Sequence, residues 1–321
     1  MTQEIQEQAY VTQELAGLRF DQATALLFPQ FSRAQHQTWI KSGCTQRNKK
    51  NTVQNKKVAL GDCITITATL AVQITQAPQA IPLNIVHEDE DLLIINKPAG
   101  LVVHPGAGNP DHTLLNALLH HAPALSHLPR GGIIHRLDKS TSGLLLITKT
   151  LTSHQLMTQA MEARAIQREY QAIAQGHIIA GGTISAPIGR HPKQRTKMAV
   201  TPHGKKAVTH YRTLKKYPGH THLTIQLETG RTHQIRVHFA HIHHPLVGDP
   251  QYLNQIRLPK QTPETVRMAV RSFKRQALHA ARLTIPSMHN QPERTFTAAL
   301  PEDMVALLAT LDKAYSPETT A

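Results

Sequence analysis

Hydrophobic positions in the first part of the chain recur with two different periods. A helical spacing from Phe20 to Leu27 stops before a proline, and a second helical stretch runs from Ser32, with capping-box spacing, to Gly43. Further on, "CITITATL" alternates apolar and polar residues as a strand does. The pattern predicts a helix pair and a strand in a small domain over residues 15–75, after a loose polar lead-in over residues 1–14.

A longer series of strand and helix patterns follows a stretch with two prolines. "ITQAPQAIPLN" has little periodicity, and we expect a linker over residues 76–84. Beyond it, "LNIVHEDEDLLIINKPAGLVVHP" predicts two strands around an acidic turn, and "HTLLNALLHHA" predicts a short helix. Antiparallel-type turns recur among mixed strand and helix patterns. This favours an α+β fold for one large domain over residues 85–312, followed by a tail over residues 313–321.

One polar segment lies between two apolar runs in "IIHRLDKSTSGLLLITKT". The run "GLLLI" at residues 143–147 is typical of a strand buried on both faces, so the polar residues before it form a loop at one end of a central sheet. That loop holds one carboxylate, Asp138. An acid beside buried structure needs hydrogen-bond donors or a cation to stay ionised. These residues alone fit a turn-capping Asp as well as a catalytic one.

A second segment supplies a cation for this acid. "LTIQLETGRTHQIRVHFAHIHHPLVGD" begins as an alternating strand and turns into a helix near Thr232, with Ile235 and Phe239 on the buried face. Arg231 lies at the junction, where we expect its guanidinium to reach Asp138 bidentately. A carboxylate held in this way stays ionised and can act as a nucleophile or general base.

The charge of the chain indicates a polyanionic partner. There are 35 Lys and Arg residues against 21 Asp and Glu residues, a formal net charge of +14, and nucleic acid is the first candidate. Residues 191–216 hold eight Lys and Arg residues and no acid, and a second basic zone covers residues 231–275. A solvated surface is the alternative for such stretches. The residues we expect to contact RNA are Arg33, Gln37, Lys41, Lys193, Arg195, Lys197, Lys205 and Lys206.

These segments together resemble a known enzyme family. "VHEDEDLLIINKPAGLVVHP", "GGIIHRLDKSTSGLLLITKT", "LETGRTHQIRVHFAHIHHPLVGDP" and "RQALHAARLTIP" follow one another over about residues 80–310 and resemble the RluA/RluD family of RNA pseudouridine synthases. "SRAQHQTWIKSG" and the basic, strand-rich segment after it resemble the alpha-L RNA-binding domain. With that domain in front, the chain is similar to the RluD branch, which modifies large-subunit ribosomal RNA.

The resemblance implies a reaction and a role for five residues. Asp138 would be the catalytic aspartate, Arg136 would help to extrude the target nucleotide, Tyr170 would pack on the flipped uracil, Arg231 would pair with Asp138, and Ile235 would wall the base pocket. Uridine would become pseudouridine by exchange of its N1–C1′ bond for a C5–C1′ bond, without a redox change, so we expect no cofactor. The carboxylate would attack C1′, attack the uracil ring, or take a proton from C2′. The base must leave its stack to be reached.

The same residues leave alternatives open. "HFAHIHHP" holds four histidines, and His238 and His241 have a spacing found in metal sites. No cysteine or paired acids accompany them, so we expect no metal. The chain could instead act on tRNA, or bind RNA without catalysis. Two cysteines, no CxxC, no signal peptide and no apolar run of about 20 residues predict a cytoplasmic protein without a membrane span. We expect a monomer, and the family resemblance implies ribosomal RNA as its partner.

Overall fold

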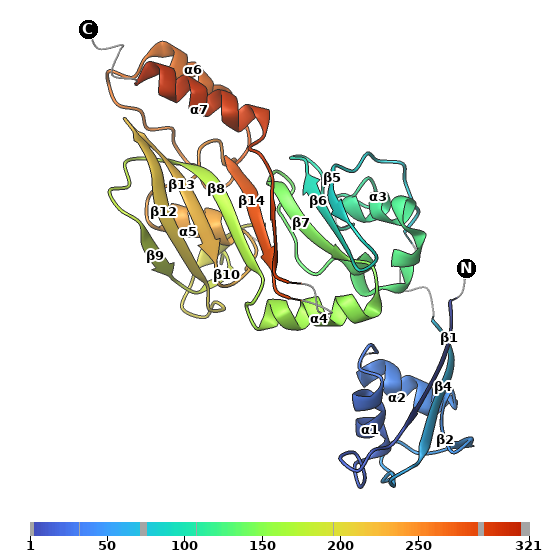
Figure 1. The fold of residues 1–321 in the computed structure, drawn as a ribbon. Helices are drawn as coiled ribbons and strands as arrows, with labels where there is room; N and C mark the ends of the chain where they lie inside the picture. Colours follow the sequence, from blue (N-terminus) through green and yellow to red (C-terminus); the bar gives the residue numbers. More distant parts are fainter. Residues whose placement is uncertain are drawn as a thin grey trace.

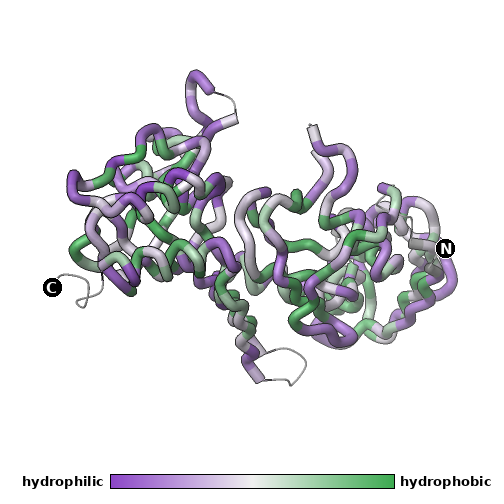
Figure 2. Tube along the Cα trace, turned by 90° about the horizontal axis from the view of Figure 1, so that it is seen from above, coloured by the Kyte–Doolittle hydropathy of each residue, from purple (hydrophilic) through white to green (hydrophobic). Residues whose placement is uncertain are grey.

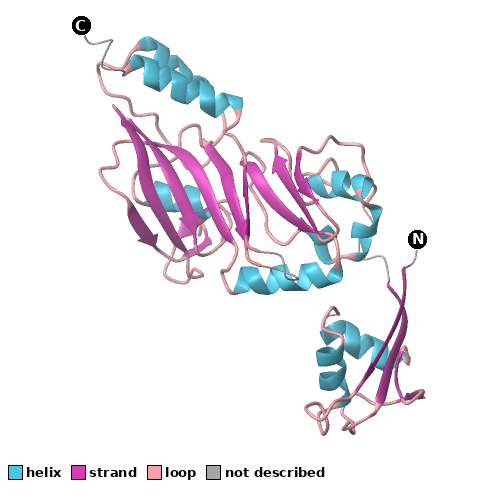
Figure 3. Ribbon diagram, in the orientation of Figure 1, coloured by secondary structure: helices cyan, strands magenta, loops and turns pink. Residues whose placement is uncertain are grey.

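The protein has a small N-terminal sheet with two helices and a large mixed sheet with helices on both faces (Figure 1, Figure 3). The computed structural model describes residues 3–31, 33–70, 76–106, 108–194, 196–287 and 292–315. The α+β fold predicted from the sequence, with a mixed and mainly antiparallel central sheet, is confirmed. Among the described residues no helix is both long and apolar enough to cross a membrane.

The N-terminal unit is a four-stranded sheet in the order β1-β4-β2-β3. The predicted helix pair and strand are present, and Trp39 and Ile40 are buried in the core of this unit. Gly43 has a φ of +78° and follows the last residue of the second helix, as a helix terminator does. Ser32, the predicted cap, lies outside the described residues. The elements are β1 (Gln3–Tyr10), α1 (Phe20–Leu27), α2 (Arg33–Ser42), β2 (Thr45–Arg47), β3 (Lys50–Asn51) and β4 (Cys63–Leu70).

Residues 3–10 form a strand, so the expectation of a loose lead-in over residues 1–14 is wrong. β1 pairs with β4 in antiparallel register from Gln3 opposite Leu70 to Tyr10 opposite Cys63. Ile5 is buried in the core of the N-terminal unit. The local pattern does not predict this strand because few apolar residues alternate with its Gln and Glu residues. Its hydrogen bonds come from a distant part of the chain.

The large sheet has nine strands within the described residues, in the order β5-β6-β7-β14-β8-β13-β12-β9, with β15 also paired to β14. β7 and β14 are parallel, and the other neighbouring strands are antiparallel. A separate hairpin joins β10 to β11. The strands are β5 (Ile85–Glu88), β6 (Leu92–Lys97), β7 (Ser142–Thr148), β8 (Gln167–Gln175), β9 (Gly182–Ser185), β10 (Ile188–Arg190), β11 (Met198–Val200), β12 (Val208–Tyr217), β13 (His220–Leu227), β14 (Leu278–Ile285) and β15 (Arg294–Thr297).

Helices cover both faces of this sheet. In Figure 2 hydrophobic stretches alternate with hydrophilic ones along the trace of the large domain. On β7, which is buried along its whole length, Leu145 and Ile147 pack with α3 and α5, whereas Leu144 and Leu146 pack with α4 on the opposite face. α6 and α7 cover Ile173 of β8. The predicted doubly buried strand is therefore confirmed. The helices are α3 (Leu114–His121), α4 (Leu151–Glu162), α5 (Gln234–His241), α6 (Glu264–Ser272) and α7 (Glu302–Ala314), with short 3-10 helices at Pro123–His127 and Pro129–Gly132.

The segment expected to be a linker is attached to the large domain. The backbone N–H of Gln79 donates to the carbonyl of Asn116 on α3, and the Asn116 side chain donates to the carbonyl of Ala77. Leu83 packs against the core beneath it. From Ala77 onward the chain is therefore fixed to the large domain. At the other end α7 continues to Ala314, slightly past the expected start of the tail.

Candidate active site

The polar loop before β7 is fixed to the sheet at both ends. Asp138 lies in this loop, and its carbonyl accepts a hydrogen bond from the backbone N–H of Thr141, which closes a turn next to β7. On the other side of Asp138, Nε2 of the buried His135 accepts the backbone N–H of Leu146 at 3.1 Å. Burial, assisted by the cation of Arg168, lowers the pKa of His135 to about 3, so its ring is neutral and can accept this bond.

A fully buried lysine ties the same loop to the turn after β6. Nζ of Lys97 donates to the carbonyls of Pro98, Leu101 and Lys139, at 2.7, 3.0 and 3.1 Å. Three donors correspond to an ammonium group. Burial lowers the pKa of Lys97 to about 7, and the nearby Asp138 carboxylate acts in the opposite direction. Lys97 therefore fixes the backbone of Lys139, the residue after Asp138.

Asp138 is paired with Arg236, the third residue of α5. Nη1 of Arg236 lies 2.9 Å from Oδ2 of Asp138. The other guanidinium nitrogens, Nε and Nη2, hold both oxygens of the buried Asp249 at 2.7 and 2.9 Å. Burial alone would lower the pKa of Arg236, but the two carboxylates outweigh it and raise the pKa above its ordinary value. Arg236 is therefore a fixed cation that links two acids.

The expectation that Arg231 pairs with Asp138 is wrong. Arg231 is exposed, and its Nε donates to the backbone carbonyl of Lys206 at 3.2 Å. The predicted helix begins at Gln234 rather than near Thr232, because His233 adopts a left-handed conformation with a φ of +56°. Arg231 therefore lies in the turn before α5. The partner of Asp138 is Arg236. Its position directly after the buried Ile235, inside the predicted helix, was the only hint of this in the sequence.

His233 approaches the second oxygen of Asp138. Its Nε2 lies 3.9 Å from Asp138 Oδ1, and its Nδ1 lies 2.8 Å from the hydroxyl of Tyr252. That hydroxyl accepts the backbone N–H of Met198, so its own proton is free to go to Nδ1 of His233. Burial lowers the pKa of His233, although Asp138 opposes the shift. A neutral His233 with its proton on Nε2 is the form that this geometry favours.

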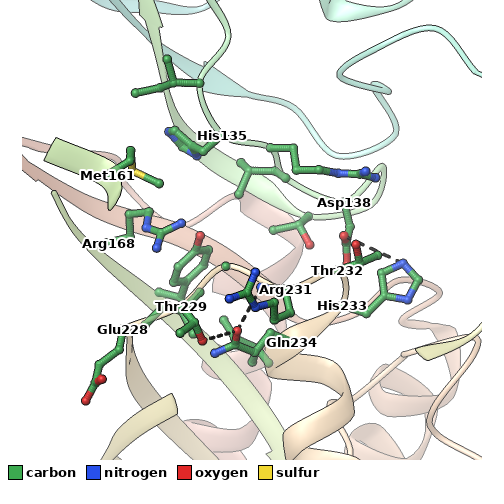
Figure 4. Close-up of a pocket in the computed structure, with 18 of the residues that line it drawn as sticks. His135, Asp138, Met161, Arg168, Glu228, Thr229, Arg231, Thr232, His233 and Gln234 are labelled. Atoms are coloured by element: carbon green, nitrogen blue, oxygen red, sulfur yellow. Dashed lines mark hydrogen bonds and ion pairs between the residues drawn. The ribbon is translucent and has the colours of Figure 1, made fainter. Parts of the chain in front are cut away.

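Two neighbouring cavities share Asp138 in their walls, and Figure 4 shows side chains that line the larger one. The larger has a volume of about 830 Å³, and the smaller, lined in part by Arg136, His233 and Arg236, has a volume of about 510 Å³. Burial raises the pKa of Tyr170, so its hydroxyl keeps its proton. All five residues predicted for the site line the larger cavity, namely Arg136, Asp138, Tyr170, Arg231 and Ile235.

Known proteins resemble this chain over nearly its whole length. Residues 91–241 match the family model described as RNA pseudouridylate synthase. Two relatives, each named ribosomal large subunit pseudouridine synthase D, come from Yersinia pestis and Escherichia coli. They are 49% identical over 312 and 309 residues, which cover 97% and 96% of this chain and 96% and 95% of the relatives. The chain belongs to the RNA pseudouridine synthase family.

Solved structures place this pseudouridine synthase in the same fold. The structure of human RNA pseudouridylate synthase domain containing 1 is similar over 74% of this chain and 90% of its own, with a TM-score of 0.55 and 26% sequence identity. Human RNA pseudouridylate synthase domain containing 4 has a TM-score of 0.56 at 24% identity, and covers 71% of this chain and 92% of its own. The region that matches the family model contains Asp138, Tyr170 and Arg236.

The basic residues of this pseudouridine synthase are split between separate surfaces. Lys193 and Lys197 lie on the β10–β11 hairpin, and Lys205 and Lys206 lie between it and β12, next to Arg231. Lys215 is at the opposite end of the ten-residue β12, about 30 Å away, where it pairs with Asp312 at 2.6 Å. Gln37 and Lys41 are on α2. Arg195 and the side chain of Arg33 lie outside the described residues.

The histidine cluster in α5 is part of the protein's own hydrogen-bond network. Nδ1 of the fully buried His238 lies 2.8 Å from the hydroxyl of Thr209, and Nε2 lies 2.9 Å from the carbonyl of Ala186. Both ring nitrogens of His238 are therefore occupied within the fold. No group of three or more His, Cys, Asp or Glu side chains in the described ranges is arranged to hold a metal ion.

Proposed function

We propose that this pseudouridine synthase converts uridine to pseudouridine in large-subunit ribosomal RNA, with Asp138 as the catalytic carboxylate. The observation that carries the proposal is the pairing of Asp138 with Arg236 where two cavities meet. The pairing fixes one carboxylate against a cation, beside a space large enough for a flipped nucleotide. A glycoside hydrolase of the usual kind would need a second carboxyl group across the bond.

The other predicted residues take roles around a flipped uridine. Tyr170 and Ile235 would contact the base from the cavity wall, and Arg231 would contact the RNA at the cavity rim. Arg136 is exposed between the two cavities, so it would take the space that the extruded nucleotide leaves in the RNA. No cofactor is needed, because the isomerisation adds no atoms and transfers no electrons to an acceptor.

The choice of RNA rests on the relatives and on charge. The relatives named ribosomal large subunit pseudouridine synthase D match this chain along nearly all of both lengths, which includes the N-terminal unit. We assign this unit to the alpha-L type of RNA-binding domain and expect Arg33, Gln37 and Lys41 to contact RNA. Lys193, Lys197, Lys205 and Lys206 would bind phosphates beside the cavity, and we expect Arg195, which lies outside the described residues, to contact RNA as well. A monomer in the cytoplasm completes the proposal, consistent with two free cysteines, Cys44 and Cys63.

Pseudouridine mapping in cells with and without the gene tests this proposal. We expect the loss of pseudouridine at large-subunit rRNA sites, and restoration by the wild-type gene. Restoration by Asp138→Asn would contradict the catalytic role of Asp138. Loss in tRNA instead would move the substrate to tRNA. No loss in any RNA, with RNA binding retained by the purified protein, would favour an RNA-binding protein without catalysis.

A further inference from the structure

Arg168 is a cation in the wall of the larger cavity, and it forms no ion pair within the part of the chain that the structure describes. It lies on β8 two residues before Tyr170, so the two side chains project from the same face of the strand. Its Nε is buried and has no hydrogen-bond partner within the described ranges. A Cβ at Gly230 would lie 3.0 Å from Nη1 of Arg168, so the absence of a side chain there leaves room for the guanidinium.

The acids around the cavity do not neutralise Arg168. Glu228 is held by Arg164 at 2.6 Å and by His210 at 2.8 Å, and Asp138 is held by Arg236. Six arginines and three acids line this cavity, an excess of three positive charges. A guanidinium is always charged, and a buried N–H without an acceptor costs free energy. The cavity is therefore built to receive a group with acceptor oxygens.

The position of Arg168 selects the kind of acceptor. Tyr170 beside it is only 5% exposed, and Arg168 itself is half-buried. RNA phosphates are strongly hydrated and would follow the exposed lysines outside the cavity. If a flipped uracil packs against the ring of Tyr170, the edge of the base with its carbonyl oxygens O2 and O4 would come close to Arg168. In Figure 4 Arg168 lies across the cavity from Asp138, with Arg231 between them.

We propose that Arg168 donates a hydrogen bond to a carbonyl oxygen of the target uracil and so orients the base during isomerisation. This inference rests on the proposed function. Cleavage of the N1–C1′ bond leaves an electron pair on the uracil, shared with O2 and O4, until C5 bonds to C1′ and a proton passes from C5 to N1. A guanidinium at one carbonyl would stabilise that charge.

The test combines changes in the enzyme with single-atom changes in the substrate. Single-turnover rates are measured on a large-subunit rRNA fragment that carries uridine, 2-thiouridine or 4-thiouridine at one target position. Sulfur is a poor acceptor, so one of the two thio substrates should slow the wild-type enzyme by about 10- to 100-fold. Arg168→Met should slow uridine conversion by a similar factor, and the thio effect should then disappear. Arg168→Lys keeps the charge and should retain part of the effect.

Control variants separate the base contact from other roles of Arg168. Arg164→Met removes a guanidinium from the same cavity and should leave the thio effect at its full size, whatever its own rate. Equal slowing of all three substrates by both Arg168 variants would overturn the inference and make Arg168 structural. Methylphosphonates at the flanking positions test for a phosphate. If one of them abolishes the effect of Arg168→Met, the partner is a phosphate and the inference fails. Failure of the wild-type enzyme on every uridine substrate would instead refute the proposed function.

Discussion

Arg236 engages only one of the two carboxylate oxygens of Asp138. Oδ2 is 2.9 Å from Arg236 Nη1, whereas in the described part of the chain Oδ1 is approached by His233 Nε2 at a longer 3.9 Å. The arginine therefore fixes the orientation of the carboxylate through one oxygen. The other oxygen is the one that a flipped nucleotide would meet.

Arg236→Lys should lower the single-turnover rate by about 100-fold or more. A lysine keeps the charge but cannot bridge Asp138, Asp249 and Gln251 as the planar guanidinium does, and a displacement of about 1 Å at a reacting group has this effect. RNA affinity should change little, because Arg236 is buried. Arg231→Lys is the matched comparison. It should retain more activity than Arg236→Lys, and the opposite order would restore Arg231 as the main partner of Asp138.

Lys97→Met should weaken catalysis although Lys97 would not contact the substrate. The change leaves the carbonyls of Pro98, Leu101 and Lys139 without their shared donor. We expect the free energy of unfolding to fall by about 1–3 kcal/mol. The single-turnover rate should fall by about 10-fold or more because the loop that carries Asp138 is loosened. Both are measured on one preparation, by denaturant unfolding and by rapid quench.

Lys139→Met is the control for this change, because Lys139 is exposed on the same loop. It should alter RNA affinity more than the free energy of unfolding. If Lys97→Met instead weakens RNA binding and leaves stability unchanged, then Lys97 is not the anchor of the loop.

His135 should make the folded protein sensitive to acid. The pKa of its ring is lowered to about 3 from the ordinary 6.5, mainly by burial. Between these two pH values the unfolded chain binds a proton that the folded protein does not. The free energy of unfolding should therefore fall with decreasing pH, by up to about 1.4 kcal/mol per pH unit from this group. Urea unfolding at pH 7, 6 and 5 should show a shallower decline for His135→Asn than for the wild type.

His120→Asn, at an exposed position on α3, controls for the loss of a histidine as such. It should keep the wild-type pH dependence. Equal slopes for the wild type and His135→Asn would mean that protonation of His135 does not oppose folding.

Lysines near the cavity should account for much of the salt dependence of RNA binding. Replacement of Lys193, Lys197, Lys205 and Lys206 by Gln should reduce the slope of log affinity against log salt by roughly 2–4 units, since each phosphate contact contributes about 0.7–0.9. Filter binding between about 50 and 200 mM salt measures the slope. Lys215→Gln with Lys216→Gln, at the far end of β12, should change it much less. A larger change from this second pair would place the RNA on the other surface.

Local patterns were sufficient wherever the burial of a side chain follows the period of its own element. The run "GLLLI" predicts β7, and Ile235 and Phe239 are buried in one core because positions four apart share a helix face. The loop that carries Asp138 follows from the same reasoning, since polar residues beside a buried strand must lie at its end. Family resemblance then placed Tyr170 and Arg136 at the cavity.

The sequence by itself therefore determined the class of fold, the main elements, the loop of Asp138 and the excess of positive charge. Only the tertiary structure decided which arginine holds Asp138, because the left-handed turn at His233 delays α5 and directs Arg236, not Arg231, to the carboxylate. It also decided that β1 is a strand, since its hydrogen-bond partners come from β4. Arg168 belongs to this second group. Among the described residues it has no counter-ion, which depends on charges that the fold brings together from distant segments, and no periodicity along the chain predicts that.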